Sequence, residues 1–256
     1  MILDDENILR YSRNIILPEI GGKGQEKLIN SKVLAIGAGG LGSPLIMYLA
    51  AAGVGNITVM DHDSVDISNL QRQVIHNMQT LGLSKVESAK AFVNKLNPDV
   101  QIKALNKKID NKNVNIMEQE HDIIADGSDN FDTRYLVADT CFIEKKTLVS
   151  AAITKYEGQI STWKHSPLNN LPCFRCLFPN KPKNPEAYTC STNGVLGSLA
   201  GFLGALQATE VIKEVLGIGV SLSGYLNIYD LLNNNFRKIK VNVDPDCKFC
   251  KKSRNG

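Results

Sequence analysis

A short glycine-rich stretch, GAGGLG at residues 37–42, gives the first chemical signal in this sequence. Gly37 permits a tight turn, Gly39 lets the backbone approach a phosphate, and Gly42 lets the following helix pack closely against a strand. The N-terminus of that helix favours an anion. Asp61 follows roughly 20 residues later, where an acid accepts hydrogen bonds from ribose hydroxyls. The motif therefore predicts a nucleotide with a free ribose, but it does not distinguish NAD from ATP.

Three charged residues favour ATP. Arg72 follows Asp61 in the stretch DHDSVDISNLQRQ, and Lys85 begins a predicted helix. Asp129, in DGSDN, ends a predicted strand, at the edge where ligands bind in parallel sheets. A triphosphate carries about four negative charges, which cations and a metal must offset before a nucleophile can attack. Taken singly, Lys85 could be a solvated helix start, Arg72 part of a surface ion pair, and Asp129 a helix cap. Together the three residues predict ATP and Mg²⁺.

Four cysteines occur in two C-x-x-C motifs, CFRC and CKFC. Paired motifs of this kind supply four thiolates for tetrahedral zinc. We therefore predict a structural zinc site that clips the C-terminal tail to the central loop, and a redox dithiol pair is the alternative. Its ligands are Cys173, Cys176, Cys247 and Cys250.

Two further cysteines have different settings. Cys141 lies in an apolar helical stretch and is predicted to be buried, whereas Cys190 lies in the polar stretch AYTCSTNG. Either a reactive thiol or an ordinary side chain fits Cys190. The sequence contains no G-x-S-x-G and no HExxH, and its histidines are scattered. A carboxylate nucleophile needs no strong general base, so its attack on the α-phosphate of ATP fits this composition.

The elements that would position these residues alternate along the chain. Apolar strands are predicted at KVLAIG, NITVMD, VQIKAL, HDIIADGSDN and TLVSAA, with helices between them, including one over 134–146. This alternation predicts a mostly parallel sheet covered on both faces. After about residue 155, GQISTWK, YLNIYD and FRKIKVNV predict antiparallel strands. The stretch 194–209 predicts a buried helix in which Gly197 and Gly201 let another backbone come close.

Composition excludes several classes of protein. The 256 residues are 43% hydrophobic and 21% charged, as in an ordinary globular protein. A net charge of +3 without a basic cluster argues against nucleic-acid binding. We expect no membrane span, because the most apolar stretch is too short to cross a bilayer. We expect a cytoplasmic location, because the acidic N-terminus does not resemble a signal peptide.

The order of several motifs resembles one known family. RYSRNIIL, GAGGLGS, AGVGNITVMDHDSVDISNLQRQ, SKVESA, DGSDN, YEGQI and the two cysteine motifs follow one another over residues 8–250. The chain resembles the ubiquitin-activating-like (ThiF/MoeB/HesA) adenylyltransferases of thiazole and molybdopterin synthesis. The resemblance implies an α/β Rossmann-like homodimer that uses ATP and Mg²⁺ to adenylate a small ubiquitin-fold sulfur carrier ending in Gly-Gly.

The resemblance also assigns roles to individual residues. Gly40 and Asn130 would lie beside the nucleotide, and Arg13 would reach into the active site of the partner subunit. Cys190 matches a cysteine that some members use for covalent transfer. The same match extends to residues that would wrap the phosphates, namely Ser68, Asn69, Leu70, Gln71 and Arg72, together with Lys85.

The expected organisation is one continuous domain in three parts. Residues 1–30 form an N-terminal helical arm, residues 31–155 a nucleotide-binding half, and residues 156–256 a half that binds the carrier and the zinc. Because the sequence ends shortly after the last zinc cysteine, we expect a separate sulfurtransferase or cysteine desulfurase to supply sulfur. Three alternatives remain: an NAD-dependent oxidoreductase, a non-catalytic carrier-binding scaffold, and an adenylyltransferase acting on another carboxylate or on an RNA base.

Overall fold

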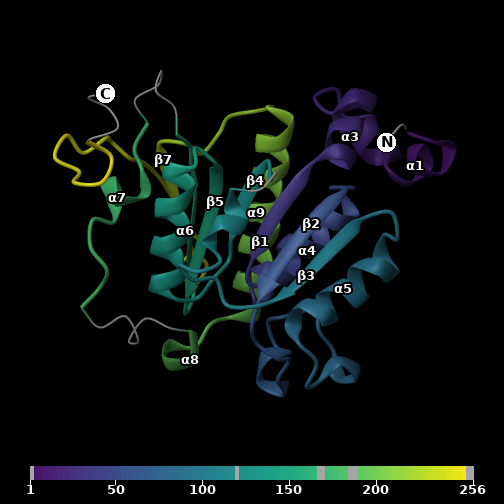
Figure 1. Ribbon diagram of the computed structural model, residues 1–256, viewed down its shortest axis with the longest axis horizontal. Coiled ribbons are helices and arrows are strands. Elements are labelled where there is room, and N and C mark those ends of the chain that lie inside the picture. Colours follow the sequence, from purple (N-terminus) through teal and green to yellow (C-terminus); the bar gives the residue numbers. More distant parts are fainter. Residues whose placement is uncertain (1–2, 119–120, 166–170, 184–189, 252–256) are drawn as a thin grey trace.

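One sheet organises the molecule, with helices on both of its faces (Figure 1). The computed structural model describes residues 3–118, 121–165, 171–183 and 190–251. The strands are β1 (Lys32–Ile36), β2 (Asn56–Asp61), β3 (Gln101–Asn106), β4 (Ile123–Asp126), β5 (Thr147–Thr154), β6 (Glu157–Trp163), β7 (Tyr225–Asp230) and β8 (Asn235–Lys240). The α-helices are α1 (Asp5–Arg10), α2 (Ser12–Ile15), α3 (Gly21–Asn30), α4 (Gly42–Ala51), α5 (Lys85–Leu96), α6 (Phe131–Ile143), α7 (Phe174–Leu177), α8 (Cys190–Asn193) and α9 (Gly197–Leu216). Short 3₁₀ turns are η1 (Ile67–Asn69), η2 (Met78–Thr80) and η3 (Val114–Met117).

The strands follow the order β3-β2-β1-β4-β5-β6-β7-β8. The first five are parallel, and β6, β7 and β8 are antiparallel to their neighbours. Both features confirm the fold expected from the sequence. The order reverses between β1 and β4, so the loops that follow these two strands diverge and leave a crevice at the carboxyl edge of the sheet.

Two apolar cores lie on opposite faces of the sheet. Along β1, Val33 and Ala35 face the core covered by α3, α4, α5 and α9, whereas Leu34 and Ile36 face the core covered by α6 and η3. A strand that is buried on both faces must be apolar at every position, which explains the continuous apolar run of KVLAI.

Helix α9 packs against α4 and the sheet, and it extends beyond the predicted 194–209. It ends at Gly217, whose φ of +74° suits a left-handed C-terminal cap. A Cβ on Gly197 would lie 2.2 Å from the carbonyl oxygen of Gln71, so the predicted close approach is confirmed there. A Cβ on Gly201 would meet no atom of the described chain within 4 Å outside its own helix, so no close approach forms there within this chain. The second close approach falls at Gly204, where a Cβ would lie 2.4 Å from the Leu41 carbonyl oxygen.

Element boundaries differ locally from the predictions. Helix α6 begins at Phe131, before the predicted 134, because the side chain of Asn130 accepts a hydrogen bond from the Thr133 N–H at 2.9 Å. The arm folds as three short helices. None of the helices in the described part of the chain has the length and apolar character needed to span a lipid bilayer.

Candidate nucleotide-binding site

A cavity of about 390 Å³ opens at the carboxyl edge of the sheet, where β1, β2 and β4 end. The residues predicted for the site fall into two groups. The structure brings together around this cavity Gly37, Gly39, Gly40, Asp61, Arg72, Lys85, Asp129 and Asn130. The other predicted residues that the structure describes do not line the cavity, namely Arg13, Gly42, Ser68, Asn69, Leu70 and Gln71. The side chain of Cys190 lies outside the described residues.

The glycine loop has the backbone geometry that its composition predicts. Gly37 has a φ of +91°, a conformation that a residue with a Cβ rarely adopts. A Cβ on Gly42 would lie 1.9 Å from the Gly37 carbonyl oxygen, so α4 can start against the loop only because this residue is glycine. A Cβ on Gly39 would have one neighbour, the Gln73 amide nitrogen at 3.6 Å. Gly39 therefore leaves room for a ligand rather than for protein.

Asp61 ends β2 and holds the loop in place. One carboxylate oxygen accepts a hydrogen bond from the Ala38 N–H, and the other accepts one from the Asp63 N–H, both at 2.8 Å. Each oxygen keeps a second lone pair, so the carboxylate can also accept bonds from ribose hydroxyls.

Lys85, at the start of α5, is buried, with a side-chain exposure of 7%. Its ammonium nitrogen lies 2.8 Å from a carboxylate oxygen of Asp63, which is 51% exposed. Burial by itself raises the pKa of Asp63, but the hydrogen bond and charge of Lys85 outweigh burial and bring this pKa below its usual value. The sequence suggested a solvated helix start as the ordinary alternative for Lys85, and the burial of its side chain excludes that alternative.

The stretch before Arg72 is held by its own hydrogen bonds. The Asp66 side chain accepts a bond from the Ser68 N–H at 2.8 Å, and the Asn69 side chain accepts one from the Asp66 N–H at 3.2 Å. The Arg72 guanidinium donates to the Ser68 carbonyl at 3.0 Å. This capped turn directs Arg72 toward the cavity, whereas the side-chain oxygen of Asn69 accepts a hydrogen bond within the cap.

His76 is a residue of the site that sequence reasoning missed. It is buried, with one ring nitrogen 2.8 Å from the Ser88 hydroxyl and the other 2.9 Å from the Ala38 carbonyl oxygen. Burial lowers its pKa, and the nearby charge of Lys85 lowers it further. A neutral imidazole thus ties the glycine loop to α5. Four scattered histidines gave no signal that could single it out.

Asp126, at the end of β4, was also missed. It is fully buried, one of its oxygens accepts a bond from the Ser128 N–H at 2.9 Å, and the other has no partner in the described structure. Burial raises its pKa despite the nearby positive charge of Arg134. Arg134 donates to the Ser128 carbonyl, so two polar side chains fix the turn that carries Asp129.

The four predicted metal ligands meet in one cluster, with their sulfur atoms within 4.8 Å of one another. The sulfur of Cys173 lies 3.8 Å from those of Cys176 and Cys247, and Cys176 and Cys250 are 3.6 Å apart. Sulfurs bound at about 2.3 Å around tetrahedral Zn²⁺ lie about 3.8 Å apart, whereas disulfide sulfurs lie about 2.0 Å apart. Burial and the neighbouring thiols raise the pKa of Cys173, so the thiolate is costly to form in the empty cluster. A bound dication would stabilise the thiolate and remove this cost. These cysteines could therefore hold one zinc ion.

Arg13 does not line the cavity. Arg13 lies on α2 with an exposed side chain, and Cys190 is the first residue of α8. The cavity of this chain therefore gives no role to Arg13.

The fold and the cavity define a Rossmann-like α/β protein with its ligand site at the switch point of the sheet. The chain belongs to the ThiF family, whose model matches residues 11–249.

Curated relatives carry names that describe activating enzymes. The chain is 46% identical over 248 residues to the SAMP-activating enzyme E1 of Haloferax volcanii, covering 97% of this chain and 90% of that protein. It is 43% identical to the adenylyltransferase and sulfurtransferase MOCS3 of Culex quinquefasciatus, again over 97% of this chain. The chain spans only 56% of the length of that relative.

Solved structures share the fold. The crystal structure of Escherichia coli MccB with ATP superposes with a TM-score of 0.80, at 22% identity, over 94% of this chain and 74% of that chain. The complex of MccB with MccA-N7isoASN gives a TM-score of 0.81 over 97% of this chain and 75% of that chain, also at 22% identity. This likeness shows that the whole sheet and its helices follow a known arrangement.

Proposed function

We propose that this protein uses ATP to adenylate the C-terminal glycine carboxylate of a small ubiquitin-fold sulfur carrier, releasing pyrophosphate. One observation carries the proposal: the glycine loop, Asp61, Arg72, Lys85 and Asp129 all face one cavity. The relative with the name SAMP-activating enzyme E1, which matches almost over its full length, supports the same class of reaction.

The charges around the cavity favour a triphosphate over NAD. Among the described residues, six basic and four acidic side chains line it. The basic ones are Arg72, Lys85, Lys107, Lys108, Arg134 and Arg237, and the acidic ones are Asp61, Asp63, Asp129 and Glu157. An NAD-dependent oxidoreductase needs little beyond the helix N-terminus for its pyrophosphate. A non-catalytic scaffold would need none of these basic side chains, because it would have no triphosphate charge to neutralise.

The reaction follows from this arrangement. Asp61 binds the ribose, and the loop around Gly39 binds the phosphates, with Asn130 beside the nucleotide. A carboxylate oxygen of the carrier attacks the α-phosphorus, a new P–O bond forms, and the bond to pyrophosphate breaks as pyrophosphate takes the electron pair. Arg72 and Lys85 stabilise the charge on the phosphates. Asp129, an exposed carboxylate on the cavity wall, would hold Mg²⁺, which supplies further charge neutralisation.

No general base is required, because the attacking carboxylate is already ionised at neutral pH. His76 lies near the loop, but both of its ring nitrogens are engaged within the protein. The proposed nucleophile therefore has no proton to give to His76, or to His62 on the cavity wall.

The steps after adenylation complete the proposal. The cysteine cluster holds a structural zinc ion, and sulfur reaches the carrier adenylate from a separate sulfurtransferase or cysteine desulfurase in the cytoplasm. Cys190 serves this later transfer and is not needed for adenylation. Cys190→Ser should therefore retain pyrophosphate exchange, and a folded variant without exchange would contradict this division of labour.

The protein acts as a homodimer in which Arg13 of each subunit completes the site of the other. The exposed position of Arg13 on α2, outside the cavity of its own chain, supports this arrangement. Arg13→Ala and Lys85→Ala homodimers should each be nearly inactive. Random remixing of the two should restore up to about a quarter of wild-type activity, because half the dimers are mixed and half their sites intact. If Arg13 acted within its own chain, no activity would return.

Lys85→Ala tests the adenylation site directly. It should lower carrier-dependent ATP–pyrophosphate exchange by about 10²-fold or more, because Lys85 stabilises charge that develops during transfer. Asp63, left without its partner, is half exposed and remains solvated, so the fold should survive. Lys95→Ala, on the exposed last turn of the same helix, is the matched control and should keep wild-type exchange. Wild-type exchange in Lys85→Ala would overturn the assignment.

A further inference from the structure

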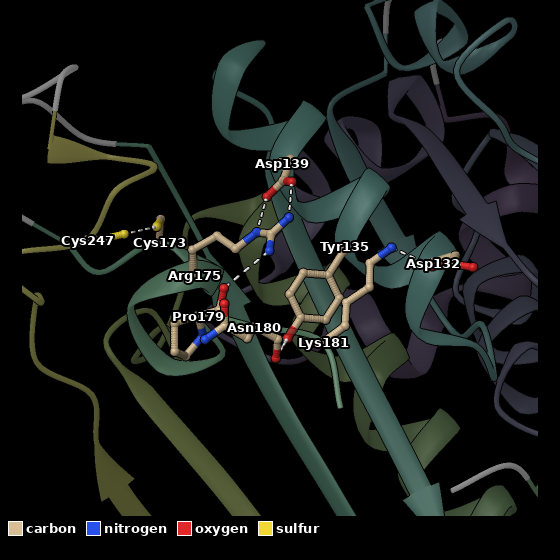
Figure 2. Close-up of polar contacts among 9 residues, drawn as sticks. All are labelled: Asp132, Tyr135, Asp139, Cys173, Arg175, Pro179, Asn180, Lys181 and Cys247. Carbon is tan, nitrogen blue, oxygen red and sulfur yellow. Dashed lines mark hydrogen bonds and ion pairs between the residues drawn. The ribbon is translucent and has the colours of Figure 1, made fainter. Parts of the chain in front are cut away.

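Arg175 lies between the two cysteines of the first C-x-x-C motif, on α7, but it is turned toward α6 (Figure 2). Its guanidinium forms two parallel hydrogen bonds with the Asp139 carboxylate, at 2.9 and 2.6 Å. Both side chains are less than one-quarter exposed, so water screens this pair only in part. The planar fork of arginine makes such a paired contact, which lysine cannot reproduce.

The same guanidinium lies over two aromatic rings. Its central carbon is 4.3 Å from the centre of the Tyr135 ring and 6.0 Å from that of Phe249, which belongs to the second cysteine motif. Tyr135 lies one turn before Asp139 on α6, so Arg175 contacts two residues on one face of this helix. Arg175 therefore joins the cysteine cluster to α6.

The contacts continue into the cavity. Tyr135 is 3% exposed, packs edge-on against Phe174 with ring centres 5.2 Å apart, and donates its hydroxyl to the Asn180 carbonyl at 2.7 Å. Phe174 in turn lies 5.5 Å from Trp163. These three aromatic residues line the cavity and form what we call the aromatic wall.

The aromatic wall lies too far from Asp61 to hold the adenine. Asp61 ends β2 at the carboxyl edge, whereas Trp163 lies on the antiparallel β6, four strand spacings across the sheet, and pairs with Leu148 near the start of β5. At about 4.8 Å for each spacing, the separation is about 19 Å. An adenine attached to a ribose held at Asp61 would instead lie beside Met60 and Ile109, which also line the cavity. The aromatic wall is thus left for the second substrate.

We propose that Arg175 is a positioning residue, which fixes the aromatic wall and thereby the approach of the acyl substrate to the nucleotide. The role in substrate approach rests on the proposed adenylation, whereas the role in fixing the wall does not. Arg175 touches neither the loop around Gly39 nor Lys85, so its effect should fall on the carrier and not on ATP.

The test compares Arg175→Ala with Lys181→Ala. Lys181 pairs with Asp132 on α6, but Asp132 is 83% exposed, and an exposed pair contributes little. Its ammonium nitrogen lies 5.8 Å from the centre of the Tyr135 ring, farther than the 4.3 Å of Arg175, so Lys181 is a cation near the same wall without a paired carboxylate contact. In Arg175→Ala the KM for a Gly-Gly-ended carrier should rise about tenfold, with the KM for ATP within about twofold of wild type. Zinc content should stay unchanged, because all four thiols remain. Lys181→Ala should match wild type in each measurement.

Trp163, the only tryptophan in the sequence, reports on the aromatic wall without any activity. In Arg175→Ala its fluorescence should shift to longer wavelength and become more accessible to acrylamide, and Arg175→Lys should not restore it. If wild-type protein shows no exchange, the proposed function fails, and Trp163 still decides whether Arg175 fixes the wall. Unchanged emission together with an unchanged carrier KM would overturn the inference.

A second variant covers the case in which Arg175→Ala does not fold. Asp139→Asn lies outside the cysteine motif and removes only the charge of the partner. It should raise the carrier KM in the same direction, and the double variant should be no worse than Arg175→Ala, because both changes break one contact. Wild-type kinetics and emission in Asp139→Asn, or full additivity of the two changes, would overturn the proposal.

Discussion

The two ends of the cavity are built in different ways. At the nucleotide end, residues 37–88 position one another: Gly37 turns the chain, the Asp61 carboxylate holds Ala38, and the His76 ring ties the loop to Ser88 on α5. At the cysteine end, the side chains come from segments far apart, since Cys176 and Cys250 are separated by 74 residues. The nucleotide end depends on a glycine turn and on contacts within one stretch of the chain, whereas the cysteine end depends on a contact between distant segments that a metal would complete.

Loss of the metal should show most clearly that the two ends are independent, because it should affect stability and zinc content but not ATP binding. Cys250→Ala should lose the zinc, about one ion for each chain, and several kcal/mol of stability, because metal binding contributes to folding when four thiolates must be held together. ATP binding should persist, since residues 37–85 include none of the cysteines. Metal analysis, thermal unfolding and a nucleotide titration measure these effects.

The control for this change is Cys141→Ala. Cys141 is buried outside the cluster, and burial raises the pKa of its thiol well above the usual value, so it remains an uncharged core side chain. Its removal should cost about 1 kcal/mol and leave zinc in place. Purified wild-type protein with no metal and free thiols throughout would contradict the zinc assignment.

The difference between the two ends also explains what the sequence could predict. The glycine spacing located the turn at Gly37 and the close contact at Gly42, because both follow from backbone sterics within a few residues. The alternation of apolar strands with helices predicted the mostly parallel sheet, because parallel neighbours need such crossover connections. The paired C-x-x-C spacing predicted that four cysteines meet in one cluster, which could hold zinc.

Contacts between segments were harder to predict. The burial of Lys85 depends on Asp63, 22 residues earlier, and the role of His76 depends on Ala38. The pattern could not show that Gly204, and not Gly201, meets α4, because this depends on how α9 is rotated against its neighbour. The predicted roles of Arg13 and Cys190 stay predictions.

Gly42→Ala should have the opposite effect on the two ends: it should disrupt the nucleotide end and spare the cysteine end, with a smaller loss of stability than Cys250→Ala. The new Cβ would overlap the Gly37 carbonyl oxygen at 1.9 Å, so α4 and the loop must move apart at a cost of about 3 kcal/mol or more. ATP binding should be lost, whereas zinc should remain bound. Gly39→Ala is the matched control for stability: its Cβ meets only a flexible side chain, so the fold should survive while nucleotide affinity falls. Equal stability of the two variants would show that the loop is not fixed by this contact.

The smallest effect should come from pH and should also be confined to the nucleotide end. The Ala38 carbonyl can only accept, so the ring nitrogen of His76 that faces it carries the proton, and the other nitrogen accepts from Ser88. Burial lowers the pKa of His76 in the folded protein, so below a pH of about 6.5 the unfolded chain binds more protons and stability falls. His121, whose pKa burial also lowers, adds a similar term that is common to wild type and a His76 variant.

His76→Gln isolates this contribution because glutamine keeps hydrogen-bonding groups but does not titrate. At pH 7.5 the variant should be less stable than wild type by about 1 kcal/mol, the net value of one buried hydrogen bond. As the pH falls from 7.5 to 5.5, wild type should lose the stability that the neutral imidazole contributes, and the difference between the two proteins should narrow. Urea unfolding at several pH values measures this difference. A constant difference would mean that His76 has the same pKa in the folded and the unfolded chain, and a difference that widens toward low pH would contradict a lowered pKa. Zinc content should be the same in both proteins at pH 7.5, because none of the contacts of His76 reaches the cysteine end.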